Sequence, residues 1–374
     1  FTDPAGSASA VTITDISGQK TKNTATGSTA IDDITNEWSD GTNITSNPDD
    51  AETIIDAAAP MISDLAIYDT NNDALIDKII VSFSELVDTD NGNAPVAGDF
   101  GTIKLPDNQS AVFTGASFTD PAGSASAVTI TDISGQSTGN TGVGATAIYG
   151  LSTEWKDASA LPVVTQSPDD FETITDLAAP VLLSASYKDI NPSPQPDGTV
   201  DRVDAIYSED ISGSTFEAAD WTFPTNGANF TAASATFNGS TVEITVTGAA
   251  AETTVFGTTT GLYTANAGTA NSIKDAAATP NTASTSSATT VADAARPIMI
   301  SAFTGDSDTN GSIDQVVVKF SEPVDLSNVD KNNFALTESA GGSPTIKNKY
   351  NASDATSITF NLTGVTANNT SLAI

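Results

Sequence analysis

Hydrophobic and polar residues alternate in short runs along most of the chain, and clusters of Gly, Asn, Asp, Ser and Thr separate these runs. Near the C-terminal end, for example, Val316, Val318 and Phe320 fall on one face of a strand by period-two alternation. Thr, Val and Ile dominate the runs, which suits pleated strands. No segment carries a helical period over three turns. The pattern therefore predicts an all-β protein.

The same combination of an acidic loop followed by a strand occurs three times, in residues 69–88, 189–211 and 306–325. A proline precedes the first Asp of each stretch by nine residues, at Pro60, Pro180 and Pro297. We interpret each stretch as the front of one repeat, which begins with the proline, a strand, an acidic loop and a second strand.

The prolines are 120 and 117 residues apart, which is the size of an independent domain and too long for a solenoid repeat. Residues 1–19 also recur without change at 118–136. We therefore predict the back part of a repeat at 1–59, complete repeats at 60–179 and 180–296, and the front part of a further repeat at 297–374. Since both ends cut through repeats, we expect a piece of a longer chain.

Seven or eight short strands in a repeat of this length predict a two-sheet β-sandwich. In the first complete repeat we expect strands near residues 61–68, 78–84, 101–105, 110–114, 126–133, 146–149, 161–165 and 171–175. We expect equivalent strand pairs in the three copies at 61–68/78–84, 181–188/202–208 and 298–303/315–321. The alternation predicts three buried strand faces, formed by Ile79, Val81 and Phe83, by Val203, Ala205 and Tyr207, and by Val316, Val318 and Phe320.

Composition narrows the possible functions. The net charge is −34, from 47 acidic and only 13 basic residues, which argues against nucleic acid as a partner because phosphate binding needs basic patches. Such a charge fits a chain that recruits cations or lives in salt. Cysteine and histidine are both absent, which excludes disulfides, a Ser-His-Asp triad and most zinc sites. No apolar run is long enough to span a bilayer.

One motif carries a resemblance to a known family. The segment FSEPVDLSNVDKNNFALT (320–337), with the VVV strand before it, resembles the Ig-like repeats of bacterial S-layer proteins and giant cell-surface adhesins. FSELVD (83–88) repeats the motif, YSEDIS (207–212) is a divergent copy, and NSIKDAAATPNTAS (271–284) is similar to the late segment of those repeats. The resemblance implies tandem Ig-like β-sandwich domains in an extracellular structural or adhesive array, often stiffened by calcium.

The acidic loops are candidate calcium sites because calcium prefers six to eight oxygen ligands, and alternate Asp and Asn residues supply them. The spacing in the third loop matches the start of an EF-hand loop, but Val317 occupies the position of the bidentate glutamate. The alternative is that these carboxylates form Asx-turns and are simply solvated. The candidate ligands are Asp69, Asn71, Asp73 and Asp77; Asp189, Asp197 and Asp201; and Asp306, Asp308, Asn310 and Asp314.

Two further sets of residues have a functional and a structural interpretation. Asp56, Asp176 and Asp293 stand four residues before the hinge prolines, where they could bind calcium between domains or belong to a solvated acidic linker. Trp38 and Trp155 are equivalent by the repeat and could stack on a sugar, although a single Trp in a small sandwich is more often part of the core.

We therefore expect an extracellular, cell-surface array whose repeats form a surface layer, stalk or filament, with neighbouring repeats or other copies of the chain as partners. We expect no enzymatic activity, because the carboxylate pairs recur with the repeat and an active site rarely does so. One alternative is an adhesin in which one repeat binds a glycan or another cell-surface ligand. Another is a homopolymer in which the incomplete repeats of neighbouring subunits complete each other.

Overall fold

The structure of the protein is a computed structural model, which describes residues 29–31, 52–53, 59–89, 92–100, 102–105, 110–133, 148–149, 155–157, 174–190, 196–223, 231–251, 258–259, 262–265, 273–277, 279–287, 289–325, 330–338, 344–351, 356–365 and 372–373. Predictions for Trp38, Asp56 and the strand near 161–165 lie outside these residues.

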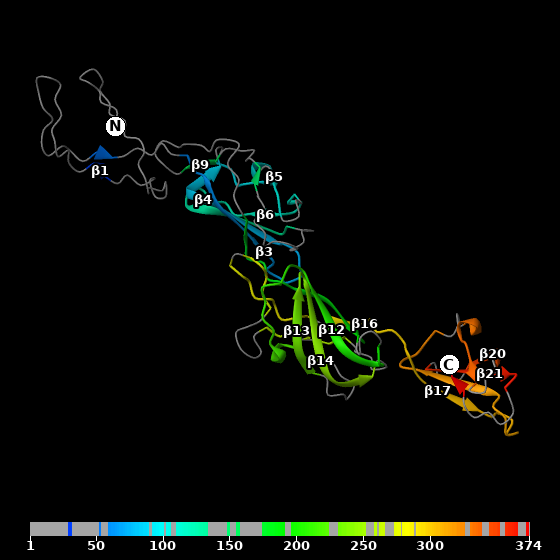
Figure 1. The fold of residues 1–374 in the computed structure, drawn as a ribbon. Helices are drawn as coiled ribbons and strands as arrows, with labels where there is room; N and C mark the ends of the chain where they lie inside the picture. The colour runs from blue at the N-terminus through cyan, green and yellow to red at the C-terminus, as the bar shows by residue number, and fades with distance from the viewer. Residues whose placement is uncertain are drawn as a thin grey trace, which may run out of the picture. The chain divides into compact units, whose positions relative to one another are not determined.

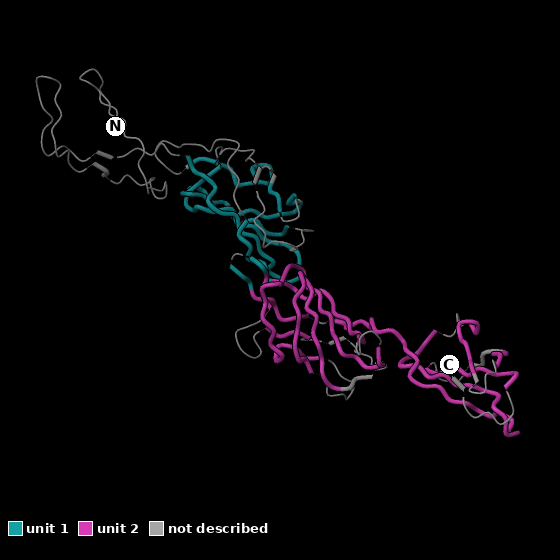
Figure 2. The backbone as a smooth tube through the Cα atoms, viewed as in Figure 1, with its two compact units in different colours: residues 1–179, 276–281 teal, residues 180–275, 282–374 magenta. Residues whose placement is uncertain are grey.

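The prediction of an all-β fold of tandem domains is confirmed: the described residues form strands and three short 3-10 helices, and no α-helix occurs among them (Figure 1). The short helices are η1 (Ala97–Phe100), η3 (Ala218–Asp220) and η5 (Lys331–Asn333). The chain divides into two compact units, one of residues 1–179 with 276–281 and one of residues 180–275 with 282–374 (Figure 2). The finer division into four parts stays a prediction.

The first unit contains a mainly antiparallel sheet with the strand order β10-β3-β4-β7-β6. Strand β10 is parallel to β3, and β9 also pairs with β4. Two two-stranded sheets, β5-β8 and β1-β2, accompany it. The strands are β1 (Thr29–Ile31), β2 (Glu52–Thr53), β3 (Ile62–Tyr68), β4 (Lys78–Thr89), β5 (Thr102–Ile103), β6 (Ser117–Phe118), β7 (Ala125–Thr131), β8 (Ile148–Tyr149), β9 (Trp155–Asp157) and β10 (Ile174–Asp176).

The second unit contains the six-stranded sheet β13-β14-β12-β11-β16-β15, the four-stranded sheet β17-β18-β21-β20 and the pair β19-β22. Their strands are β11 (Leu182–Lys188), β12 (Thr199–Tyr207), β13 (Thr231–Asn238), β14 (Thr241–Ala251), β15 (Thr258–Thr259), β16 (Thr289–Asp293), β17 (Met299–Gly305), β18 (Gln315–Phe320), β19 (Thr337–Glu338), β20 (Thr345–Asn351), β21 (Ser357–Thr363) and β22 (Leu372–Ala373).

The three predicted strand pairs are present in equivalent positions, as β3/β4, β11/β12 and β17/β18. Each pair is antiparallel, and each has an irregularity in its register at the same place, between Ile62 and Asp64, Leu182 and Ser184, and Met299 and Ser301. A serine fixes the start of each pair, because its hydroxyl accepts the N–H of the residue after the proline at 3.0 Å; the serines are Ser84, Ser208 and Ser321.

The predicted inward faces are confirmed for the first two copies and for Val316 and Val318, which are all at most 4% exposed. Phe320 is the exception, because it is only half-buried at the edge of its hydrophobic cluster. Strand β4 also continues to Thr89, beyond the predicted end at residue 84. The expected strand at 110–114 is wrong, since only an isolated bridge from Ser110 to Lys104 occurs there, and the short strands β6 and β9 were not predicted.

Trp155 lies in the core of the first complete repeat, as the structural interpretation predicted. Its side chain is fully buried, with its ring centroid 5.0 Å from that of Phe83 and 5.4 Å from that of Phe100. A buried indole cannot stack on a sugar at the surface. The sugar-stacking interpretation of Trp155 is therefore wrong.

Candidate metal sites in the acidic loops

The first Asp of each acidic loop accepts two backbone N–H groups from the far side of its own loop. Asp69 accepts from Asp73 at 3.2 Å and from Ala74 at 2.8 Å. The other two loops repeat both bonds, from Asp197 (3.3 Å) and Gly198 (2.6 Å) to Asp189, and from Asn310 (3.2 Å) and Gly311 (2.7 Å) to Asp306. The same bonds in all three copies show why this Asp recurs: it closes the loop.

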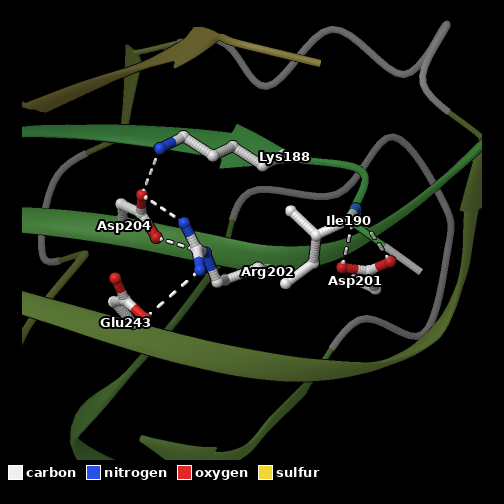
Figure 3. A network of polar contacts seen from close by, with 6 residues as sticks. All are labelled: Lys188, Ile190, Asp201, Arg202, Asp204 and Glu243. Carbon is white, nitrogen blue, oxygen red and sulfur yellow. Dashed lines mark hydrogen bonds and ion pairs between the residues drawn. The ribbon is translucent and has the colours of Figure 1, made fainter. Parts of the chain in front are cut away.

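The last Asp of each loop accepts a hydrogen bond from the residue that directly follows the first Asp. Asp77 accepts the backbone N–H of Thr70 at 3.0 Å, and Asp314 accepts that of Ser307 at 2.7 Å. The hydroxyl groups of Thr70 and Ser307 donate to the second oxygens of these carboxylates. In the second loop, both oxygens of Asp201 lie 3.2 Å from the backbone nitrogen of Ile190 (Figure 3).

The residue that donates the shorter bond to the first Asp has a left-handed backbone in every copy. The φ angle is 88° at Gly198, 86° at Gly311 and 68° at Ala74. Glycine adopts this conformation without steric cost, whereas alanine does not. The loss of glycine in the first loop therefore leaves the loop closed but strained.

Of the three acidic loops, as far as the structure describes them, only the third brings three carboxylates together. Oxygen atoms of Asp306, Asp308 and Asp314 lie within 4.8 Å of one another. The remaining predicted ligand, Asn310, uses its Nδ2 to donate to Asp308 at 2.8 Å and its Oδ1 to accept from Ser312 at 2.8 Å. Three of the four predicted ligands thus converge on one point, and the amide oxygen of Asn310 is directed elsewhere.

The first loop repeats the turns of the third with Asp and Asn exchanged, and the second loop keeps only part of them. In the first, Asn71 Nδ2 donates to Asp73 at 3.1 Å, and Asp73 also accepts the N–H of Leu75. In the second, Asp197 accepts the backbone N–H of Thr199 at 2.9 Å, which fixes the start of β12. The predicted ligands in these loops therefore form turns, as the Asx-turn interpretation expects. Whether any of the loops binds calcium stays a prediction.

Local hydrogen bonds and burial determine the charge of these carboxylates. The Ser307 hydroxyl and N–H groups lower the pKa of Asp314, so this carboxylate remains ionised at neutral pH. Burial raises the pKa of Asp69, although the N–H groups of Ala74 and Asp73 oppose this effect. The third loop consequently presents a compact, solvent-accessible negative charge.

A polar hollow of about 500 Å³ lies beside the third loop. It is lined by Ser307, Asp308, Asp314, Gln315, Lys347, Asn361 and Leu362. Gln315 Nε2 donates to Asn361 Oδ1 at 3.2 Å across strands β18 and β21, so two amide groups are fixed in its wall. This hollow combines carboxylate, amide, hydroxyl and ammonium groups in one place.

Basic residues, which are scarce in this chain, converge on a single buried carboxylate in the second complete repeat. Asp204 is 7% exposed and lies 2.5 Å from Lys188 Nζ and 2.7 Å from Arg202 Nε (Figure 3). Arg202 also forms an ion pair with Glu243 at 3.2 Å. Because these residues come from β11, β12 and β14, the network links three neighbouring strands.

The repeat also aligns one glutamate in each copy, and the sequence makes Glu322 a candidate to complete the calcium shell of the third loop, although the cluster of Asp306, Asp308 and Asp314 does not include it. The glutamates that follow the Phe-Ser or Tyr-Ser pair at the end of the second strand are Glu85, Glu209 and Glu322, called here the FSE glutamates. Each lies two residues after an aromatic residue, and all three are buried. The period-two alternation contained this signal, because it continues the inward face from the aromatic residue to the glutamate.

Comparison with known proteins leaves the chain without an assigned relative: neither models of known protein families nor curated proteins gave a match. Among the described residues, no helix is long and apolar enough to cross a membrane.

Proposed function

We propose that this chain is a structural repeat array of a cell surface, in which β-sandwich domains span distance as part of a surface layer, stalk or filament. The observation that carries the proposal is the repetition of one closed loop. The same pair of backbone bonds to the first Asp occurs in all three copies, with matching register in the strands on either side. Such repetition favours a mechanical role, because a catalytic or ligand site is rarely copied into every domain.

Calcium is the proposed stiffening ion. The net charge of −34 opposes compaction, and clustered carboxylates such as Asp306, Asp308 and Asp314 repel each other most. Weak sites with dissociation constants of about 10⁻⁴–10⁻³ M, the range of extracellular modules, would be filled outside cells and empty inside. In this proposal the chain leaves the cell flexible and becomes stiff on arrival.

Imaging tests the proposal directly. Low-magnification electron microscopy of the native assembly should show a lattice, stalk or filament, and small-angle scattering of the 374-residue chain should give less flexible particles in millimolar calcium than in chelator. Isolated globular particles in the native source, with scattering curves that calcium does not change, would contradict it.

The polar hollow beside the third loop supports a second candidate function, an adhesin that binds a glycan. Hydroxyl-rich ligands are recognised by fixed polar groups of the kind that Gln315, Asn361 and Asp308 provide. A glycan array probed with the whole chain tests this candidate. Binding that survives Asn361→Ala would place the glycan elsewhere, and binding to no glycan would remove the candidate.

A further inference from the structure

The first and last strands of both complete repeats lie side by side and run in the same direction. In the repeat at 60–179 the first strand is β3 and the last is β10, and in the repeat at 180–296 they are β11 and β16. Both pairs are parallel, whereas the other strand pairs of these two sheets are antiparallel in the part of the chain that the structure describes. The chain therefore enters and leaves each repeat on two neighbouring strands.

The two parallel pairs share one register. Ile174 lies opposite Leu65 in the first pair, and Val291 lies opposite Ala185 in the second. Ile174 and Val291 stand at the same place before the next hinge proline, and Leu65 and Ala185 stand at the same place after the preceding one. Two copies of the repeat with different side chains thus build the same ladder.

Each ladder is extended by one backbone bond and packed beneath apolar side chains. The N–H of Leu177 donates to the carbonyl of Ile67 at 3.0 Å, and the N–H of Ala294 donates to that of Tyr187 at 3.1 Å. The side chains on the inner face of the ladders are at most 7% exposed; they are Leu65, Ile67, Ile174, Ala185, Tyr187 and Val291. Burial beside apolar side chains strengthens these hydrogen bonds relative to bonds in water.

Tension along the chain acts on such a pair in a particular way. It pulls β3 toward its start and β10 toward its end, and because the two strands are parallel, these pulls are opposed along the strand axes. The strands can separate only by sliding past each other, which loads all bonds of the ladder at once. If the first and last strands were antiparallel, both pulled ends would lie at the same end of the pair, and the bonds would open one after another at lower force.

We propose that the pairs β3–β10 and β11–β16 are clamps that bear tension, so that the two complete repeats stay folded when the array is pulled. The force runs from the incoming proline through the first strand to the last strand and the next proline, and the other strands of each sheet lie outside this direct path. The role rests on the proposed array function, whereas the resistance to force is a property of each repeat and is measured on the chain alone.

The direction of pulling tests the proposal. The chain has no cysteine, so handles for optical tweezers can be attached to cysteines introduced at chosen places in the whole 374-residue chain. Handles at Leu183→Cys and Ala294→Cys sit at opposite ends of the β11–β16 pair, whereas handles at Ile190→Cys and Ala294→Cys sit at the same end. All three positions are exposed. The first geometry should need a several-fold higher unfolding force than the second, and equal forces overturn the proposal.

A proline variant tests the ladder bond itself, because forced unfolding reports the barrier to unfolding. Ala294→Pro removes the N–H that donates to Tyr187, and it fits behind Asp293, which is extended in β16. Pulled by its two ends, the parent should give two high-force events, and the variant should lower the force of one of them. Ala295→Pro removes only the bond to the side chain of Asp293, so it is the matched control and should keep both forces.

Unchanged forces in Ala294→Pro overturn the proposal, and if that variant fails to fold, the two pulling directions decide. Failure of the clamp and failure of the array function are distinguishable. Equal forces in the two directions, with a lattice, stalk or filament in the native source, remove the clamp and leave the array. Isolated particles in the native source remove the load-bearing role, even where the forces differ.

Discussion

Gly198 lies directly against Ser321: a β-carbon on Gly198 would come within 3.2 Å of the Ser321 Cβ and 3.3 Å of Ile300 Cγ2. Gly198 closes the second acidic loop, whereas Ser321 fixes the first strand pair of the following repeat. Gly311 has nearly the same φ angle and the same bond to its Asp, but a β-carbon there would have no atom within 4 Å. The two glycines form a natural comparison.

Gly311→Ala should destabilise the protein by about 1–2 kcal/mol, the cost of a left-handed alanine. Gly198→Ala should cost about 1–3 kcal/mol more, because its methyl group also displaces Ser321 and Ile300. Urea unfolding of both variants measures the difference. Equal losses would show that Ser321 and Ile300 move aside for the added methyl group without cost.

Phe83 and Phe320 are equivalent in the repeat, but replacing them by alanine should destabilise the protein by different amounts. Phe83 is 4% exposed and contacts Trp155, so Phe83→Ala should cost about 3–5 kcal/mol. Phe320 is only half-buried, so Phe320→Ala should cost less than about 2 kcal/mol in proportion to its smaller buried area. Denaturant unfolding followed by circular dichroism tests both, and a larger loss for Phe320→Ala would contradict the assigned burial.

The alternation of Ile79, Val81 and Phe83 was sufficient to predict a strand, its inward face and its antiparallel partner. Strands β6 and β9 could not be predicted, because two or three residues are too few to show a period. For the acidic loops, sequence spacing identified the Asp positions that recur in the three copies but not their hydrogen bonds.

Asp204 should be important for the stability of its sheet. Asp204→Asn leaves Lys188 and Arg202 next to a neutral side chain, and we expect a loss of about 1–3 kcal/mol in the free energy of unfolding. Glu243→Gln is the control, because this ion pair is more exposed and should contribute at most about 1 kcal/mol. Similar losses from the two substitutions would mean that burial does not strengthen the network.

Glu322 should give the protein a pH-dependent stability in the absence of calcium. Its pKa is raised from 4.5 to about 7 in the folded state, so the folded protein binds this proton more tightly than the unfolded chain. The resulting stabilisation is fully present below about pH 4.5 and is lost as the pH rises through 7. Melting curves in chelator should therefore show a smaller decrease over this range for Glu322→Gln than for the parent, and parallel curves would refute the assignment.

The third acidic loop should account for part of any calcium response. The double variant Asp306→Ala and Asp308→Ala removes two of its three converging carboxylates, and it should bind fewer calcium ions than the parent and lose part of the calcium-induced rise in melting temperature. In chelator the variant should also lose the bonds from Asn310 and Gly311 to Asp306. Unchanged calcium binding would leave this loop as a solvated turn.

The hydrogen bonds that close the acidic loops form in loops of different length. Asp189 and Gly198 form the same bond as Asp306 and Gly311, although four more residues separate the first pair. Since lengthening a loop adds only a small closure entropy, the segment between Asp189 and Asp197 offers a position for grafting foreign peptides. A chain built from such repeats could then carry epitopes or affinity tags at regular intervals, with each graft anchored by an Asp carboxylate and two backbone N–H groups.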